Sequence, residues 1–163
     1  MAIATLLLYD QSPAIAQTSS YGELQSAYLY NFAKYIRWPA EQSQYVIGVY
    51  GESEITEDLR NLLKGKKIGG KEVVVRILTD DTALDEMHIV YLPADYSRKI
   101  TFLKESTKGK SILLVTEEDL IKKGALISFT IEDDRLRFKL NKKAFANANL
   151  IASEGLLKLA ILQ

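Results

Sequence analysis

The chain has 163 residues, of which 21 are basic and 21 acidic, and it contains no cysteine. A formal net charge of zero argues against a nucleic-acid partner, because binding to phosphates normally requires a basic excess. The lack of cysteine excludes disulfides, thiolate metal sites and a cysteine nucleophile. A domain of this length buries about 68–70% of its unfolded surface, so we expect it to fold without a metal or any other cofactor.

The N-terminal residues have the pattern of the end of a signal peptide. An apolar run over residues 2–8 is followed by Ala14-Ile15-Ala16, the small-residue pattern of a cleavage site. We interpret residues 1–16 as a residual signal peptide whose start lies upstream, and residues 17–163 as one exported domain. The alternative is a cytoplasmic leader. No later stretch reaches the roughly 20 apolar residues that a membrane-spanning helix needs.

Residues 21–37 are predicted to form the first helix, which ends before Pro39 because proline disfavours the α conformation of the residue before it. One face repeats apolar residues at three- and four-residue spacing, namely Leu24, Ala27, Tyr28, Phe32 and Tyr35. The opposite face carries Glu23, Ser26, Tyr30, Lys34 and Arg37. Asn31 falls on the apolar side, so we expect its amide to be buried and hydrogen-bonded.

Strands and helices then alternate along the chain. Residues 45–50 are apolar on both faces, as in a central strand that is covered on both sides. Ser53 is the predicted N-cap of the next helix, and Gly65 is its predicted end. Further strands are predicted at 72–78, 88–92 and 111–115, with a short helix at 98–105.

The C-terminal third changes pattern. Residues 116–119 have the spacing of a capping box, which predicts a short helix. An acidic tripeptide separates two alternating segments, 126–131 and 135–140, which predicts a hairpin with one buried and one wet face. Asn141 and Ser153 are predicted caps of two final helices. The predicted fold is α/β: a single-domain three-layer sandwich with a mainly parallel sheet, an antiparallel C-terminal hairpin and helices on both faces.

Two motifs are set aside. Residues 65–71 fit the letters of a phosphate-binding loop, but Glu72 stands where a metal-coordinating Ser or Thr is required, and the segment runs from a helix into a strand. His88, the single histidine, cannot build a zinc site alone, and no serine-nucleophile motif accompanies it. Carboxylates are plentiful, but they fall in predicted turns and caps. We therefore predict no catalytic and no metal-binding residues.

Loops at the carboxyl ends of the parallel strands form the default ligand crevice of this architecture. There the sequence offers Ser53, Ser97, Arg98 and Thr116, which would suit a small anionic or polar ligand. Helix caps and turns explain the same residues without a ligand. Both interpretations stay open at this point.

Two surfaces are candidate partner sites. One is the outer face of the first helix, with Tyr30 and Arg37, and the other is the wet face of the hairpin, with Arg135 and Arg137. Tyr and Arg are frequent interface anchors because they join a large contact area to directional polar groups. The alternative is solvated surface, which on the hairpin would also deter edge-to-edge sheet pairing.

Most of the chain resembles the YfiR family. Residues 27–39 (AYLYNFAKYIRWP) are similar to the family's opening helix, and residues 47–51 to its first strand and glycine. Gly124, residues 135–141 and residues 156–160 resemble its C-terminal hairpin and last helix. The resemblance implies an exported α/β protein, since a family member binds the periplasmic portion of a membrane diguanylate cyclase and holds it inactive. Some members carry disulfides, which this chain lacks, so redox regulation is not implied.

Together these observations predict an exported, non-catalytic regulatory protein. Its partner would be the periplasmic portion of an inner-membrane signalling protein, a diguanylate cyclase or a sensor kinase, which places it in cyclic-di-GMP signalling. A homodimer and a small polar ligand stay open. The alternative is a small hydrolase or transferase that uses carboxylates in the crevice.

Overall fold

The structure is a computed structural model that describes residues 20–163. Its helices are α1 (Tyr21–Tyr35), α2 (Ile55–Leu63), α3 (Ile100–Thr107), α4 (Lys142–Asn147) and α5 (Glu154–Leu159), with 3-10 turns at Ala94–Lys99 and Ile121–Lys123. The strands are β1 (Ile36–Arg37), β2 (Tyr45–Tyr50), β3 (Lys67–Ile68), β4 (Lys71–Leu78), β5 (Ile89–Leu92), β6 (Leu113–Thr116), β7 (Ile127–Glu132), β8 (Arg135–Leu140), β9 (Ile151–Ala152) and β10 (Ile161–Leu162).

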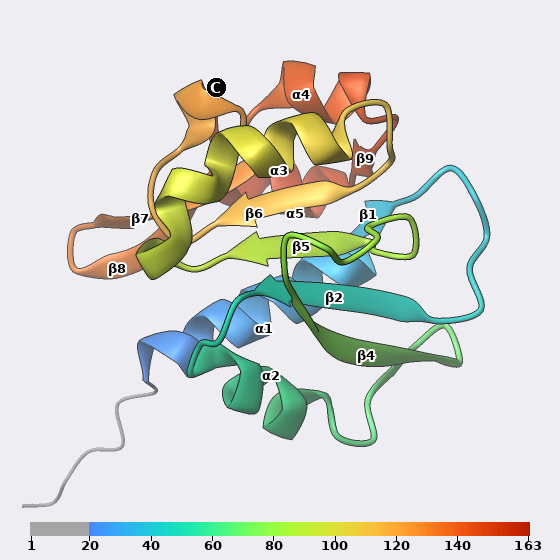
Figure 1. The fold of residues 1–163 in the computed structure, drawn as a ribbon. Coiled ribbons are helices and arrows are strands. Elements are labelled where there is room, and N and C mark those ends of the chain that lie inside the picture. The colour runs from blue at the N-terminus through green and yellow to red at the C-terminus, as the bar shows by residue number, and fades with distance from the viewer. Residues whose placement is uncertain (1–19) are drawn as a thin grey trace, which may run out of the picture.

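Within these residues, eight strands form one sheet in the order β10-β8-β7-β6-β5-β2-β4-β3 (Figure 1), and β1 pairs separately with β9. The strands β4, β2, β5, β6 and β7 run parallel to one another. β7 and β8 form an antiparallel hairpin near the C-terminus, with Phe129 opposite Phe138. At the other edge of the sheet, β3 lies antiparallel to β4. The predicted mainly parallel sheet with an antiparallel hairpin is confirmed.

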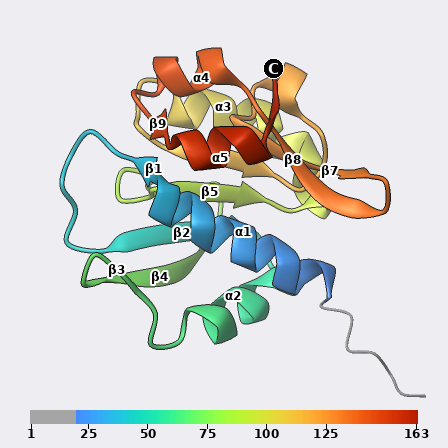
Figure 2. The ribbon, with the colours of Figure 1, turned by 180° about the vertical axis from the view of Figure 1, so that it is seen from behind.

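Helices cover both faces of this sheet. Parallel neighbours need a crossover connection, and α2 supplies it from β2 to β4 as α3 does from β5 to β6. In Figure 1, α3 lies in front of the sheet, whereas α1 and α5 lie on the opposite face and come to the front in Figure 2. The layers are those of the α/β sandwich that the sequence predicts.

The central strand β2 is buried on both faces, as predicted. Val46, Ile47, Val49 and Tyr50 are all buried. A side chain at Gly48 would overlap Leu78 of the neighbouring strand, which explains why glycine interrupts an otherwise apolar run.

The predicted orientation of the first helix is wrong. The buried residues of α1 are Gln25, Ser26, Leu29, Phe32 and Ala33. Asn31, expected inside, is exposed, and Leu24 and Tyr35 are 40% and 46% exposed. Tyrosine counts as apolar in a periodicity pattern, but its hydroxyl can face solvent. A helix with several tyrosines can therefore show an apolar stripe that is not its buried face.

Two predicted caps are wrong and two are confirmed. Ser53 does not cap α2, whose N-cap is Glu54 without a side-chain hydrogen bond. Thr116 opens no helix because it is the last residue of β6. Asn141 and Ser153, in contrast, each accept a hydrogen bond from a backbone N–H of the helix that they precede.

The cap of α4 gives a testable prediction. Asn141→Ala removes the acceptor for the Ala144 N–H, 2.9 Å away, and is expected to lower the free energy of unfolding by about 1 kcal/mol. Asn147→Ala, at the exposed opposite end of α4, is the control and should stay within about 0.5 kcal/mol of the parent. Urea unfolding of both variants measures the difference, and equal losses would contradict the role of the cap.

Candidate functional site

An open crevice of about 670 Å³ lies at the carboxyl ends of β2, β5 and β6, bordered by the first turn of α1. This is where doubly wound α/β folds place their ligands. Its lining includes five carboxylates, those of Glu52, Glu54, Asp58, Asp95 and Glu117. Among residues 20–163, no lysine or arginine lines it.

Asp58 shows how crowded these charges are. Burial raises the pKa of its carboxyl, and the neighbouring carboxylates Glu23 and Glu54 raise it further. Gly22 of α1 approaches so closely that a side chain there would overlap the Asp58 carboxylate. The wall between α1 and α2 is therefore tightly packed and negatively charged.

The inner end of the crevice holds a buried polar pair. The Tyr91 hydroxyl donates a hydrogen bond to Gln25 Oε1 over 3.1 Å, and both side chains are buried. Burial, together with the adjacent Glu117, raises the pKa of Tyr91, so this hydroxyl stays protonated. The Gln25 Nε2 atom is buried and has no hydrogen-bond partner. Glu117 accepts the Ala94 N–H over 2.7 Å, which fixes its carboxylate at the rim.

The four predicted ligand residues do not come together. Ser53 lines the crevice. Thr116 is fully buried, and its hydroxyl hydrogen-bonds to Ser128 Oγ over 2.6 Å and to the Glu118 carbonyl over 2.7 Å. Ser97 and Arg98 lie on the 3-10 turn after β5, the first with a buried hydroxyl and the second exposed. As ligand residues they remain predictions.

Crevice carboxylates entered the sequence-based alternative of a hydrolase or transferase, but neither this acidic set nor Gln25 was predicted as site residues. A usable signal existed for Glu52 and Glu117, because each lies within two residues of the carboxyl end of a parallel strand. Gln25 and Asp58 lie on helices, where no local pattern marks them.

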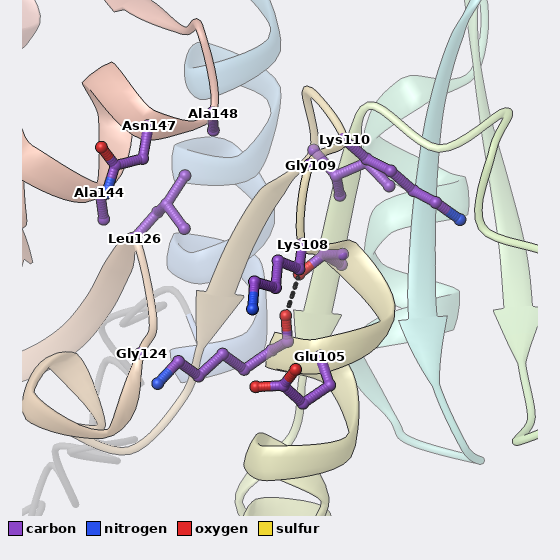
Figure 3. A pocket seen from close by; sticks show the side chains of 12 residues that line it. Glu105, Lys108, Gly109, Lys110, Gly124, Leu126, Ala144, Asn147 and Ala148 are labelled. Carbon is purple, nitrogen blue, oxygen red and sulfur yellow. Dashed lines mark hydrogen bonds between the residues drawn. The ribbon is translucent and has the colours of Figure 1, made fainter.

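A second hollow, of about 320 Å³, lies between α3 and α4 (Figure 3). Leu126 and Ala148 give it an apolar side, and Lys104 and Lys108 are among the residues that line it. Lys110 reaches away from α4 in this view and pairs with Asp85 over 3.1 Å. The charged residues here are three lysines and Glu105, and a lysine ammonium on its flexible stem is a point charge rather than a fixed set of directional donors.

A third hollow, of about 190 Å³, lies beside Trp38 and His88 near the start of β5. The Val46 N–H donates to His88 Nδ1 over 3.1 Å, so the proton of the neutral ring sits on Nε2. Burial lowers the pKa of His88, which favours this neutral form. The packing of His88 against Trp38 and Tyr45 gives it a structural role.

The predicted partner surfaces differ in availability. Arg37 and Arg135 are exposed. Arg137 is partly exposed, and its Nη1 atom forms an ion pair with Glu132 Oε2 over 3.9 Å. Tyr30 is half-buried, with the Lys66 ammonium 5.0 Å from its ring centre. Each predicted surface therefore offers one exposed arginine, Arg37 on β1 and Arg135 on β8, beside a partly buried second residue.

Comparison with known proteins gives three findings. A crystal structure of a conserved domain protein from Vibrio cholerae aligns with a TM-score of 0.65 at 11% sequence identity, over 88% of this chain. The aligned part is 60% of the Vibrio chain, and at this identity the likeness shows the fold alone. A search of the curated proteins finds no significant match. The YfiR/HmsC-like family model, however, matches residues 22–161, and the chain belongs to that family.

Proposed function

We propose that this protein is an exported, non-catalytic regulator that binds the periplasmic portion of a membrane signalling protein, a diguanylate cyclase or a sensor kinase. The observation that carries the proposal is the family match over residues 22–161. It supports regulation by protein binding because that is the role that the resemblance to the YfiR family implies. Within residues 20–163, no helix is both long and apolar enough to cross a membrane. Contact with a membrane protein is therefore proposed to use the surface of the folded domain.

The hairpin is the proposed contact surface. Arg135 and Arg137 project from β8, which forms an antiparallel pair with β7. The backbone of such a pair is held by its ladder of hydrogen bonds, so the two guanidinium groups start from a fixed base. Arg37, exposed on β1, is the second proposed anchor.

The test is capture of the membrane partner by the purified protein. Arg135→Ala with Arg137→Ala is expected to weaken capture at least tenfold, the loss of about 2 kcal/mol or more that is typical of interface anchors. Arg37→Ala with Tyr30→Phe probes the second surface while keeping the Tyr30 ring, which packs against the core. Cyclase or kinase activity of the captured protein is measured in parallel.

Lys142→Ala with Lys143→Ala is the matched control, because it removes two exposed cations from α4. The control should bind like the parent, and all variants should melt like the parent. If both variants that lack surface arginines still capture the membrane partner normally, the interface lies elsewhere on the protein. Capture without any change in signalling activity would contradict a regulatory role.

Export is a separate part of the proposal. The expected cleavage after Ala16 lies outside the described residues. Expression of the full upstream reading frame, followed by N-terminal sequencing of the periplasmic fraction, should give a start at or near Gln17. An intact N-terminus in the cytosolic fraction would contradict it.

One observation favours the second candidate, a hydrolase or transferase. The raised pKa of Asp58 is the kind of shift that a general acid needs. If it acts so, Asp58→Asn abolishes turnover of an ester or glycoside substrate without changing the melting temperature. Absence of turnover by the parent protein across such substrates leaves the binding role as the function.

A further inference from the structure

The five crevice carboxylates lack counter-charges, unlike many acids elsewhere in the fold. Seven ion pairs join carboxylates to lysine or arginine within residues 20–163, and their acids are Glu41, Glu57, Asp80, Asp85, Glu86, Asp119 and Glu132. None is Glu52, Glu54, Asp58, Asp95 or Glu117. The crevice therefore gathers unneutralised negative charge in one place.

Such a gathering favours a cation that enters the crevice. Like charges around one hollow repel one another, and an ammonium group among them replaces repulsion with attraction. Because Asp58 is partly withdrawn from water, its attraction to a cation is screened less than that of a fully exposed acid.

Gln25 supplies the second, independent observation. Its side chain is 3% exposed and lines the crevice, and its Oε1 is occupied by the Tyr91 hydroxyl. Its Nε2 is left without a partner. An unmade hydrogen bond at a buried donor is energetically unfavourable. A ligand oxygen at this point would satisfy the donor, so the bound molecule needs an acceptor as well as a positive charge.

The arrangement suits an organic cation better than a metal ion. Within residues 20–163, no three His, Cys, Asp or Glu side chains lie close enough together to hold a metal. The carboxylates are instead distributed around an opening of about 670 Å³. Separated charges of this kind match ammonium groups spaced along a flexible molecule.

We propose that the crevice at the carboxyl ends of β2, β5 and β6 binds a small organic amine that also carries a hydroxyl or carbonyl oxygen. The ammonium groups lie among Glu54, Asp58 and Glu117, and the oxygen accepts from Gln25 Nε2. This site is independent of the membrane partner and is tested on the purified protein alone.

The probe is diaminopropanol, which is glycerol with both terminal hydroxyls replaced by amines. Glycerol is the uncharged counterpart, and Ca²⁺ is the metal counterpart. Each is titrated into labelled protein at constant ionic strength, and backbone amide shifts are followed by NMR. Diaminopropanol is expected to cause saturable shifts of the backbone amides of Gly22, Ser53 and Ala94, which line the crevice. Its affinity should be at least tenfold higher than that of glycerol.

Three variants connect the shifts to the proposed groups. Asp58→Asn with Glu117→Gln should weaken diaminopropanol binding at least tenfold. Asp133→Asn with Asp134→Asn removes two exposed charges at the hairpin turn and should leave binding within about twofold. Gln25→Met removes the buried amide and should weaken diaminopropanol binding. It also leaves the buried Tyr91 hydroxyl without its acceptor and so lowers the melting temperature, and binding is therefore measured at a temperature at which this variant is folded.

The outcomes separate the occupants of the site. Equal affinity for glycerol and diaminopropanol overturns the proposal. So does a loss of diaminopropanol affinity in the Asp133→Asn, Asp134→Asn variant that equals the loss in the Asp58→Asn, Glu117→Gln variant. If Ca²⁺ gives saturable shifts and displaces diaminopropanol, the crevice is a metal site and the proposal is also overturned. Failure of this experiment leaves the membrane-capture result untouched, since that experiment uses another surface.

Discussion

Phe32→Ala is expected to lower the free energy of unfolding by about 3–5 kcal/mol, which is the range for emptying a buried aromatic site. Phe32 is fully buried on α1, and its ring centre lies 5.1 Å from that of Phe138 and 6.1 Å from that of Phe129. The substitution therefore opens a cavity between α1 and the hairpin and also removes aromatic contacts. A loss of this size lowers the melting temperature by roughly 6–20 °C in a domain of this length.

Tyr35→Ala is the control for this prediction. Tyr35 lies on the same helix but is 46% exposed, so its loss should cost no more than about 0.5 kcal/mol. Thermal and urea unfolding of both variants give the comparison. Equal losses would contradict the observed orientation of α1 and would favour the orientation that the periodicity predicts.

The order and type of the longer strands and helices could be predicted because each rests on local physics, whereas the two-residue strands β1, β3, β9 and β10 were not predicted. The run of residues 45–50 is apolar on both faces, which only a covered central strand explains, and the alternation after residue 126 predicts a hairpin. Asn141 and Ser153 satisfy backbone donors of their own helices, so a short sequence window contains the whole interaction.

Other features could not be predicted because their partners are distant in sequence. Ser26 is buried against neighbouring elements, and Gln25 is buried because Tyr91, 66 positions away, hydrogen-bonds to it. Thr116 has the letters of a cap, but its hydroxyl is taken by Ser128 of the adjacent strand. The pattern assumes a hydroxyl that is available to the following backbone, and strand pairing removes that condition.

The candidate site depends on the same long-range information. Ser53 could be placed in the crevice from the rule that ligands bind at the carboxyl ends of parallel strands. The charge of the crevice could not, because it requires knowing that β6, β5 and β2 are neighbours and that α1 closes the opening. In sequence, Glu54, Asp95 and Glu117 are three acids in unrelated turns.

His88 is expected to make the stability of this protein depend on pH in a defined direction. Burial lowers its pKa in the folded state below the ordinary value of 6.5. Between that value and the lower folded-state pKa, the unfolded chain binds a proton that the folded chain does not. The free energy of unfolding therefore has its full value above about pH 6.5 and falls as the pH drops through this window.

The structure gives the atomic cause. His88 Nδ1 accepts the Val46 N–H, and a protonated ring would set a second N–H against that donor. His88→Leu places an apolar side chain in the site and leaves the Val46 N–H without an acceptor. We expect this variant to lose about 1–3 kcal/mol of unfolding free energy at neutral pH.

The decisive measurement is the difference between parent and variant across pH. Asp85, Glu86 and Lys110 line the same hollow as His88, and they are present in both proteins. The difference between the two unfolding free energies therefore isolates the histidine. It should narrow as urea unfolding is repeated from about pH 7.5 down to pH 5, because only the parent loses the stabilisation of a neutral buried imidazole. A difference that stays constant over this range would show that His88 binds its proton over the same pH range in the folded and unfolded states, so that its folded environment accepts the charged ring.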